Sequence, residues 1–230
     1  RRHTRSLCDW SSDVCSSDLS FYYRKLIAGL RDDVRVIAPD HVGCGLSEKP
    51  GDDRYEYTLE RRVRDLEALL EHLQIEEPIT LVLHDWGGMI GLVYAVRRPE
   101  RIARLIVLNT ACGGLPPTKR LPTSIRLGRN TRLGEWLIRG GNAFLHGALY
   151  WGCRKPIPPE VRWGYLVPYD SWAHRIAVLR FVQDIPLRPG DRAYDALHEV
   201  EQNIRRLRGV PLLICWGEKD FVFDEHFLRE

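Results

Sequence analysis

Asp85 stands where this chain's pattern would place a nucleophile. It follows the continuous apolar run 79–83, Ile-Thr-Leu-Val-Leu, and precedes residues 86–88, Trp-Gly-Gly, which open a second helical pattern that ends near Arg97. A strand-turn-helix of this kind projects its central side chain into the cleft at the carboxyl ends of the strands. The small residues let helix and strand approach, and the helix amino terminus favours negative charge. The pattern predicts covalent catalysis by the Asp85 carboxylate, with a helix-capping role as the alternative.

A second glycine-containing motif covers residues 40–47, Asp-His-Val-Gly-Cys-Gly-Leu-Ser. It looks superficially like a nucleotide-binding loop, but no third glycine opens a helix, so the dinucleotide interpretation is weak. Its glycines instead permit the tight backbone geometry of a turn. The cysteines after residue 19 are scattered without C-x-x-C spacing, which argues against a zinc site and a disulfide scaffold. We therefore expect neither a metal nor an organic cofactor.

Alternating strand and helix patterns position Asp85. Five leucine and valine residues at helical spacing mark the first long helix. Strand-helix alternation at this spacing implies right-handed crossovers, and therefore an α/β fold with a mostly parallel, doubly wound sheet. Cys215 ends an apolar run, so we expect its thiol to be buried. The expected strands are 34–38, 79–83, 105–108 and 211–216, and the expected helices are 59–73, the segment after Gly88 and about 194–206.

Residues 112–190 interrupt this alternation. They are rich in proline, glycine, arginine and aromatic residues, and they are too many for a loop without structure of its own. An insert full of large apolar side chains between two sheet strands predicts a mainly helical lid over the active site. We thus divide the chain into a core, residues 20–111 and 191–230, and a lid, residues 112–190.

The lid is also strongly basic. It holds twelve lysine and arginine residues against four aspartate and glutamate residues, a net charge of +8, although the whole chain carries only +3. Such a face is either simply solvated or a docking surface for an acidic protein or a membrane.

Composition and the first residues set further limits. With 44% hydrophobic and 28% charged residues the chain is typical of a globular protein, and no run approaches the roughly 20 apolar residues of a membrane span. We expect a cytoplasmic protein with no nucleic-acid partner. Residues 9–19 resemble a common sequencing-library adapter translated in one frame. We therefore expect residues 1–19 to be non-native and to make no specific contacts.

The segment 84–88, His-Asp-Trp-Gly-Gly, resembles the aspartate-nucleophile branch of the α/β-hydrolase fold, which includes haloalkane dehalogenases and epoxide hydrolases. The resemblance covers residues 20–230. It implies that Asp85 attacks carbon, that a histidine activates water against the covalent ester, and that a second acid orients the histidine. It also implies that Trp86, whose indole is only a donor, donates a hydrogen bond to the leaving anion.

The same resemblance indicates where the second acid lies. One dehalogenase group takes it from just after the strand that follows the nucleophile, but that position here is Asn109, which is no carboxylate. The acid is then expected after the later strand, where Asp220 stands, with a plain turn residue as the alternative. The family's histidine would follow one further strand beyond Asp220, and none of the eight histidines is placed correctly. The chain as it stands is therefore expected to lack a complete triad and to be inactive.

Two segments narrow the resemblance. Residues 168–187 and 216–228 look like the cis-olefin-forming β-lactone decarboxylases of bacterial long-chain hydrocarbon biosynthesis. This resemblance implies conversion of a long-chain cis-3,4-dialkyl β-lactone to a cis-alkene and carbon dioxide, with a β-lactone synthetase as a partner in an assembly. A haloalkane dehalogenase that uses the same Asp85 and Trp86 is the main alternative. A non-catalytic scaffold with the hydrolase fold is the second.

Overall fold

A parallel sheet forms the centre of the molecule. The computed structural model describes residues 6–9, 19–152, 155–220 and 222–229. Five strands lie in the order β2-β1-β3-β4-β5, and every neighbouring pair is parallel, so the carboxyl ends of the strands meet at one edge. The strands are β1 (Ser6–Asp9), β2 (Arg35–Ile37), β3 (Ile79–Leu83), β4 (Ile102–Leu108) and β5 (Leu212–Cys215).

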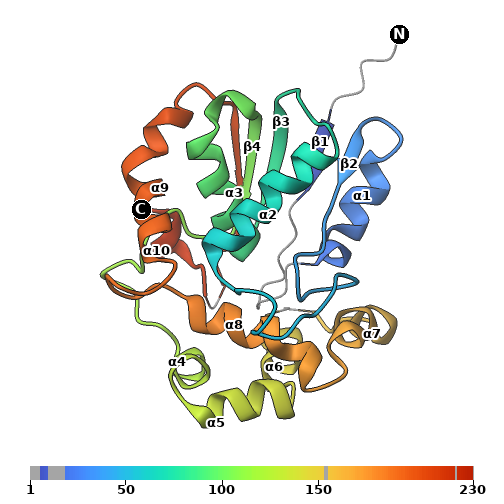
Figure 1. Ribbon diagram of the computed structural model, residues 1–230, viewed down its shortest axis with the longest axis vertical. Helices are drawn as coiled ribbons and strands as arrows, with labels where there is room; N and C mark the ends of the chain where they lie inside the picture. Colours follow the sequence, from blue (N-terminus) through green and yellow to red (C-terminus); the bar gives the residue numbers. More distant parts are fainter. Residues whose placement is uncertain (1–5, 10–18, 153–154, 221, 230) are drawn as a thin grey trace.

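Helices cover this sheet. The helices α2, α3 and α9 pack side by side, and α1 packs beside β2 (Figure 1). They are α1 (Arg24–Leu30), α2 (Leu59–His72), α3 (Asp85–Arg97), α9 (Tyr194–Asn203) and α10 (Glu225–Leu228), with short turns η1 (Ser20–Tyr23), η2 (Pro99–Arg101) and η6 (Ile204–Leu207). The predicted α/β class with a parallel sheet is confirmed.

Local sequence explains the elements that hold the site. All five residues of β3 are buried, as expected for a central strand covered on both faces. Thr58 caps α2, because its side chain accepts a hydrogen bond from the backbone N–H of Arg61 at 3.2 Å. The predicted stripe of α2 does face the core: its buried apolar residues are Leu59, Val63, Leu66 and Leu70.

The insert, residues 112–190, is mainly helical and lies at the carboxyl ends of the strands (Figure 1). Its side chains form a second apolar cluster beside the one around the sheet. Helix α8 belongs to both clusters, because Ala177 and Phe181 pack toward the sheet while Val178 and Val182 pack into the insert. The insert consists of α4 (Thr123–Asn130), α5 (Arg132–Glu135), η3 (Trp136–Gly140), α6 (Ala143–Trp151), α7 (Pro159–Leu166), η4 (Val167–Tyr169), η5 (Ala173–Arg175) and α8 (Ile176–Asp184).

The 40–47 motif is the expected turn, and it brings α8 close to the core. The Asp40 carboxylate accepts hydrogen bonds from the backbone N–H groups of Ser20 at 2.6 Å and Leu46 at 2.8 Å. Gly43 has a φ of 91°, and a Cβ there would overlap Ala177 of α8. The glycine therefore serves backbone conformation and close packing together.

Two expectations about this fold are wrong. Residues 1–19 do make specific contacts, because β1 lies between β2 and β3 and pairs with both. Ladder hydrogen bonds use backbone groups, so an unusual side-chain pattern does not prevent strand pairing. For residues 1–5 and 10–18 the expected absence of specific contacts lies outside the described residues. Cys215 is exposed rather than buried, because β5 is an edge strand whose four residues are all exposed.

Candidate active site

Asp85 occupies a strained turn between β3 and α3. It is the first residue of α3 and has a φ of 47°, in the left-handed region that costs a non-glycine residue energy. His84 occupies the position before the first residue of α3, and the helix-capping interpretation of Asp85 stays an alternative. The turn is held by its backbone: Asp85 N–H donates to the carbonyl of Asn109 at 2.8 Å, and Thr110 Oγ1 donates to the carbonyl of Asp85 at 2.6 Å.

Glycines let α3 pack tightly behind this turn. A Cβ on Gly88 would overlap the side chain of Thr110, which follows β4. A Cβ on Gly91 would overlap the side chain of Leu83, the last residue of β3. Packing therefore requires a small residue at position 88, as the sequence predicted, whereas at position 91 only the tip of the Leu83 side chain would have to move.

Asp85 and Trp86 lie together in a small apolar cavity between the core and the insert. Their side chains are 5% and 3% exposed, and the cavity measures about 70 Å³. Asp85 is the only charged residue in its lining within the described part of the chain. The other lining residues are Met89, Ala111, Gly113, Leu115, Leu121, Ile125, Phe144, Val182, Ile185, Pro186, Leu197, Val222, Phe223 and Phe227. The structure thus brings together two of the three predicted site residues.

A buried arginine lies behind Trp86. The rings of Trp86 and Phe181 have centroids 5.3 Å apart, and the guanidinium carbon of Arg62 lies 3.7 Å from the centroid of Phe181. Arg62 is fully buried, and none of its guanidinium nitrogens has a hydrogen-bond partner among the described residues. The sequence analysis did not single out Arg62. The sequence did contain an indication that Arg62 is buried, because it lies on the apolar face of α2, three residues after Leu59.

Asp184 joins the insert to the core near this arginine. It ends α8, and its Oδ2 accepts a hydrogen bond from the N–H of Leu59, the first residue of α2, at 2.8 Å. Burial raises the pKa of Asp184 to about 6, and the positive charge of Arg62 partly opposes that rise. The carboxyl therefore caps α2 from another part of the chain, a role that local sequence does not reveal.

Asp220 lies in the turn after β5 and does not line the cavity around Asp85. Its Oδ1 accepts hydrogen bonds from the backbone N–H groups of Val222 at 2.7 Å and Phe223 at 2.9 Å. Burial raises the pKa of Asp220, while these two hydrogen bonds lower it. The turn role is therefore present in the structure, and it shapes the cavity because Val222 and Phe223 line it.

Asn109 connects the turn of Asp220 to the turn of Asp85. Its Nδ2 donates to the carbonyls of Gly217 at 2.9 Å and Phe223 at 2.7 Å, and its Oδ1 accepts from the N–H of Gly217 at 2.8 Å. Its own carbonyl accepts from Asp85. Asn109 is only 7% exposed, so these bonds are shielded from water. The sequence analysis noted this position only as one that lacks a carboxylate.

Comparison with known proteins identifies the family. A model described as the alpha/beta hydrolase fold matches residues 11–139. A cis-3-alkyl-4-alkyloxetan-2-one decarboxylase of Xanthomonas campestris is 48% identical over 213 residues, which cover 90% of this chain and 71% of that protein. The chain belongs to the α/β-hydrolase family. A decarboxylase of the same name from Shewanella oneidensis is 55% identical over 210 residues, which cover 91% of this chain and 66% of that relative.

The α/β-hydrolase comparisons agree with the expected subgroup. This chain spans about two thirds of the length of the two decarboxylases. A haloalkane dehalogenase of Mycobacterium marinum is more distant, at 32% identity over 87% of this chain and 65% of that protein. The predicted likeness to β-lactone decarboxylases within a dehalogenase-like group is therefore confirmed.

Solved structures agree with this assignment. A point variant of a haloalkane dehalogenase from Agrobacterium tumefaciens superposes with a TM-score of 0.78 at 26% identity, and the match covers 92% of this chain and 72% of the other. A haloalkane dehalogenase from Bradyrhizobium elkani has a TM-score of 0.83 at 23% identity, with 94% and 74% covered, and shows the shared fold alone.

No histidine of the described chain lines the cavity that contains Asp85. His84 adjoins Asp85, but its ring is stacked on Tyr22 with centroids 4.8 Å apart. His41 is buried, and burial together with the charge of Arg62 lowers its pKa to about 3. Within the described residues, no group of three or more histidine, cysteine, aspartate or glutamate side chains could hold a metal ion, and no helix is long and apolar enough to cross a membrane.

Proposed function

We propose that the complete protein converts a cis-3,4-dialkyl β-lactone to a cis-alkene and carbon dioxide, with Asp85 as the nucleophile. One observation carries the proposal: Asp85 is the only charged residue in the described lining of an apolar cavity, and it sits on a strained turn beside Trp86. The identities of 48% and 55% to oxetanone decarboxylases support the same reaction. Because the chain spans about two thirds of those relatives, the activity is proposed for the complete protein.

The first step is a displacement at carbon. An Asp85 oxygen attacks the ring carbon that bears the ring oxygen, and the carbon–oxygen bond of the lactone breaks with inversion. The products are an alkyl ester of Asp85 and a carboxylate on the adjacent carbon. That carboxylate is the leaving anion, and the indole N–H of Trp86 is the donor assigned to it. Covalent catalysis thus opens the ring before carbon dioxide is lost.

The second step regenerates the nucleophile. The bond to the carboxylate carbon breaks, its electron pair forms the carbon–carbon double bond, and the ester carbon–oxygen bond of Asp85 breaks in an anti arrangement. Inversion followed by anti elimination amounts to syn loss, so a cis lactone gives a cis alkene. Neither water nor a proton is consumed.

The proposed reaction consumes no water, and this distinguishes it from the hydrolysis that a dehalogenase catalyses. Hydrolysis of an Asp85 ester needs a base that activates water, and no histidine lines the described cavity. We propose that the 230-residue chain alone cannot complete such a hydrolysis. In the complete protein we assign Asp220 the orienting acid of the family, acting through a histidine. Because the elimination itself uses no base, Asp220 should matter less than Asp85 for alkene formation.

The insert serves as a lid in this proposal, with residues 20–111 and 191–230 as the core. Leu121, Ile125 and Phe144 from the insert line the cavity opposite Asp85. A cavity of about 70 Å³ is far smaller than the roughly 300 to 1,000 Å³ typical of ligand sites. A lactone with two long alkyl chains therefore enters only when insert side chains such as Phe144 move apart.

The test sets a long-chain cis-β-lactone against a 1-haloalkane of similar length, and measures alkene and released halide with the complete protein. We expect alkene from the lactone, no alkene from Asp85→Asn, and about a hundredfold slower formation by Trp86→Phe, which corresponds to the roughly 3 kcal/mol of one lost donor. Asp220→Asn removes the same charge from the turn after β5 and should slow alkene formation less than Asp85→Asn does. Halide release without alkene would refute the proposal and favour a haloalkane dehalogenase.

A further inference from the structure

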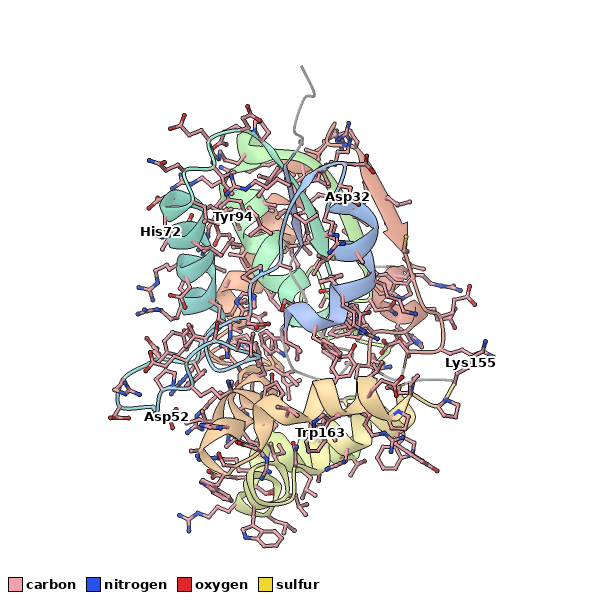
Figure 2. All side chains as sticks on the ribbon, turned by 90° about the vertical axis from the view of Figure 1, so that its right-hand side faces the viewer. Asp32, Asp52, His72, Tyr94, Lys155 and Trp163 are labelled. Carbon is pink, nitrogen blue, oxygen red and sulfur yellow. The ribbon has the colours of Figure 1, made fainter. Side chains whose placement is uncertain are left out.

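All four tryptophans of the insert are exposed. Trp136, Trp151, Trp163 and Trp172 are 62%, 75%, 68% and 43% exposed. Tryptophan is on average among the more buried residues of globular proteins, so four exposed indoles on one insert are unusual. Figure 2 labels Trp163, which belongs to helix α7 of the insert.

Two of these indoles form one surface, which we call the tryptophan patch: Leu133, Trp136, Arg139 and Trp172. A Cβ on Gly140 would lie 3.6 Å from both indole rings, so the rings flank one glycine. The guanidinium carbon of Arg139 lies 4.7 Å from the centroid of the Trp172 ring. Leu133 is 57% exposed and precedes Trp136 by three residues, which puts both side chains on one side of the helix.

The position of the patch leaves it open to a large partner. It is built on α5, η3 and the segment before η5, at the end of the molecule opposite the amino ends of the strands (Figure 1). Arg132 is exposed beside it, and Arg126 and Arg162 are exposed elsewhere on the same insert. Lys119, Arg129 and Arg180 of the insert pair with Asp224, Asp191 and Asp52 of the core, so five of its eight excess positive charges remain to attract an anionic surface.

We propose that the tryptophan patch docks the protein on the surface of an anionic lipid bilayer. Indole rings favour the headgroup level of a bilayer, because they combine an apolar body with one polar group. Each lysine or arginine near an anionic membrane strengthens binding by about fivefold. Tryptophan and arginine are also enriched at protein interfaces, so an acidic protein partner is kept as an outcome of the test. Protruding indoles beside a leucine on a cationic insert fit the headgroup level of an anionic bilayer. The inference stands independently of the proposed reaction.

The experiment measures binding of the complete protein to sedimented vesicles, either zwitterionic or containing about a third anionic lipid. We expect binding that depends on the anionic lipid, and at least about tenfold weaker binding by Trp136→Ser/Trp172→Ser, because two interfacial side chains are lost. Arg132→Glu should weaken binding to anionic vesicles only. Tryptophan fluorescence should be quenched by brominated lipids in the wild type, and less in the double variant.

Matched controls lie outside the insert. Leu46→Ser removes an apolar side chain that is 96% exposed in the 40–47 turn, and Lys25→Glu repeats the charge reversal on α1. Both should bind vesicles as the wild type does, and all variants should unfold at the wild-type temperature. No binding to anionic vesicles would overturn the proposal, as would equal binding by wild type and double variant. Loss of a copurifying protein in that variant, without any vesicle binding, would reassign the patch to a protein partner.

Discussion

Replacing Asn109 tests the link between the two turns of the candidate site. Asn109→Leu removes three buried or half-buried hydrogen bonds of 2.7 to 2.9 Å to Gly217 and Phe223. At about 1 kcal/mol for each bond, the loss of unfolding free energy is about 3 kcal/mol. Unpaired carbonyls near the cavity add to this cost, because they lose their protein partner without full access to water.

Asn109→Asp is a more specific test, because it replaces only the side-chain NH2 group by an oxygen. The new carboxyl can still accept from the N–H of Gly217, but its second oxygen replaces a donor and faces the carbonyls of Gly217 and Phe223. Repulsion and burial raise the folded-state pKa of this carboxyl above its unfolded value of about 4. The variant is therefore most stable below pH 4, relative to wild type, and loses stability as the pH rises through the raised pKa.

Urea unfolding of the 230-residue chain, followed by tryptophan fluorescence between about pH 4 and pH 8, measures both effects. Asn203→Leu is the control, because the side-chain amide of Asn203 makes one hydrogen bond to Glu199 within α9. It should cost about 1 kcal/mol and show no pH dependence relative to wild type. A cost below about 1 kcal/mol for Asn109→Leu, or a pH-independent effect of Asn109→Asp, would refute the argument that Asn109 holds the two turns together.

Three further predictions concern stability, and urea unfolding checks each. Gly88→Ala should destabilise the chain by at least about 2 kcal/mol, because its Cβ would overlap Thr110; an unchanged midpoint would show that the helix can shift. Burial raises the pKa of Asp184 to about 6, so its contribution to stability is fully present below about pH 4 and falls by about 3 kcal/mol as the pH rises through 6. Asp184→Asn should remove this dependence of the unfolding free energy on pH. If the variant keeps the dependence, other groups cause it. A chain that begins at Ser20 should unfold at lower urea, contrary to the expectation from the adapter-like stretch, because it lacks β1 between β2 and β3; an equal midpoint would show that this pairing adds no stability.

Local sequence was sufficient for the features that depend on neighbouring residues. The period of α2 and the apolar run of β3 follow from side-chain spacing, and both elements are present at the expected places. The turn at Asp85 was predictable for the same reason, since strand, small residues and helix are contiguous. The φ of 47° at Asp85 shows that the backbone makes the sharp turn that this pattern predicted.

Features that depend on contacts between distant segments were not predictable. Arg62 and Asp184 each look like ordinary charged residues in a helical pattern, and only packing of α8 on α2 buries them together. The amide of Asn109 acquires its partners from the turn after β5, which no local pattern specifies. Cys215 was misplaced because an apolar run indicates a strand, but not whether that strand lies at the edge of the sheet.

Helix α8 has a consequence for cooperativity. One helix supplies Ala177 and Phe181 to one apolar cluster and Val178 and Val182 to the other, so neither cluster can melt without exposing a face of the same helix. The insert and the sheet should therefore unfold in a single transition, with equal midpoints by every probe. For the same reason the whole insert cannot swing away as a rigid flap. The movements that admit a ligand must therefore involve α4 and α6. These insert helices line the cavity with Asp85, and none of their described residues belongs to the apolar cluster around the sheet.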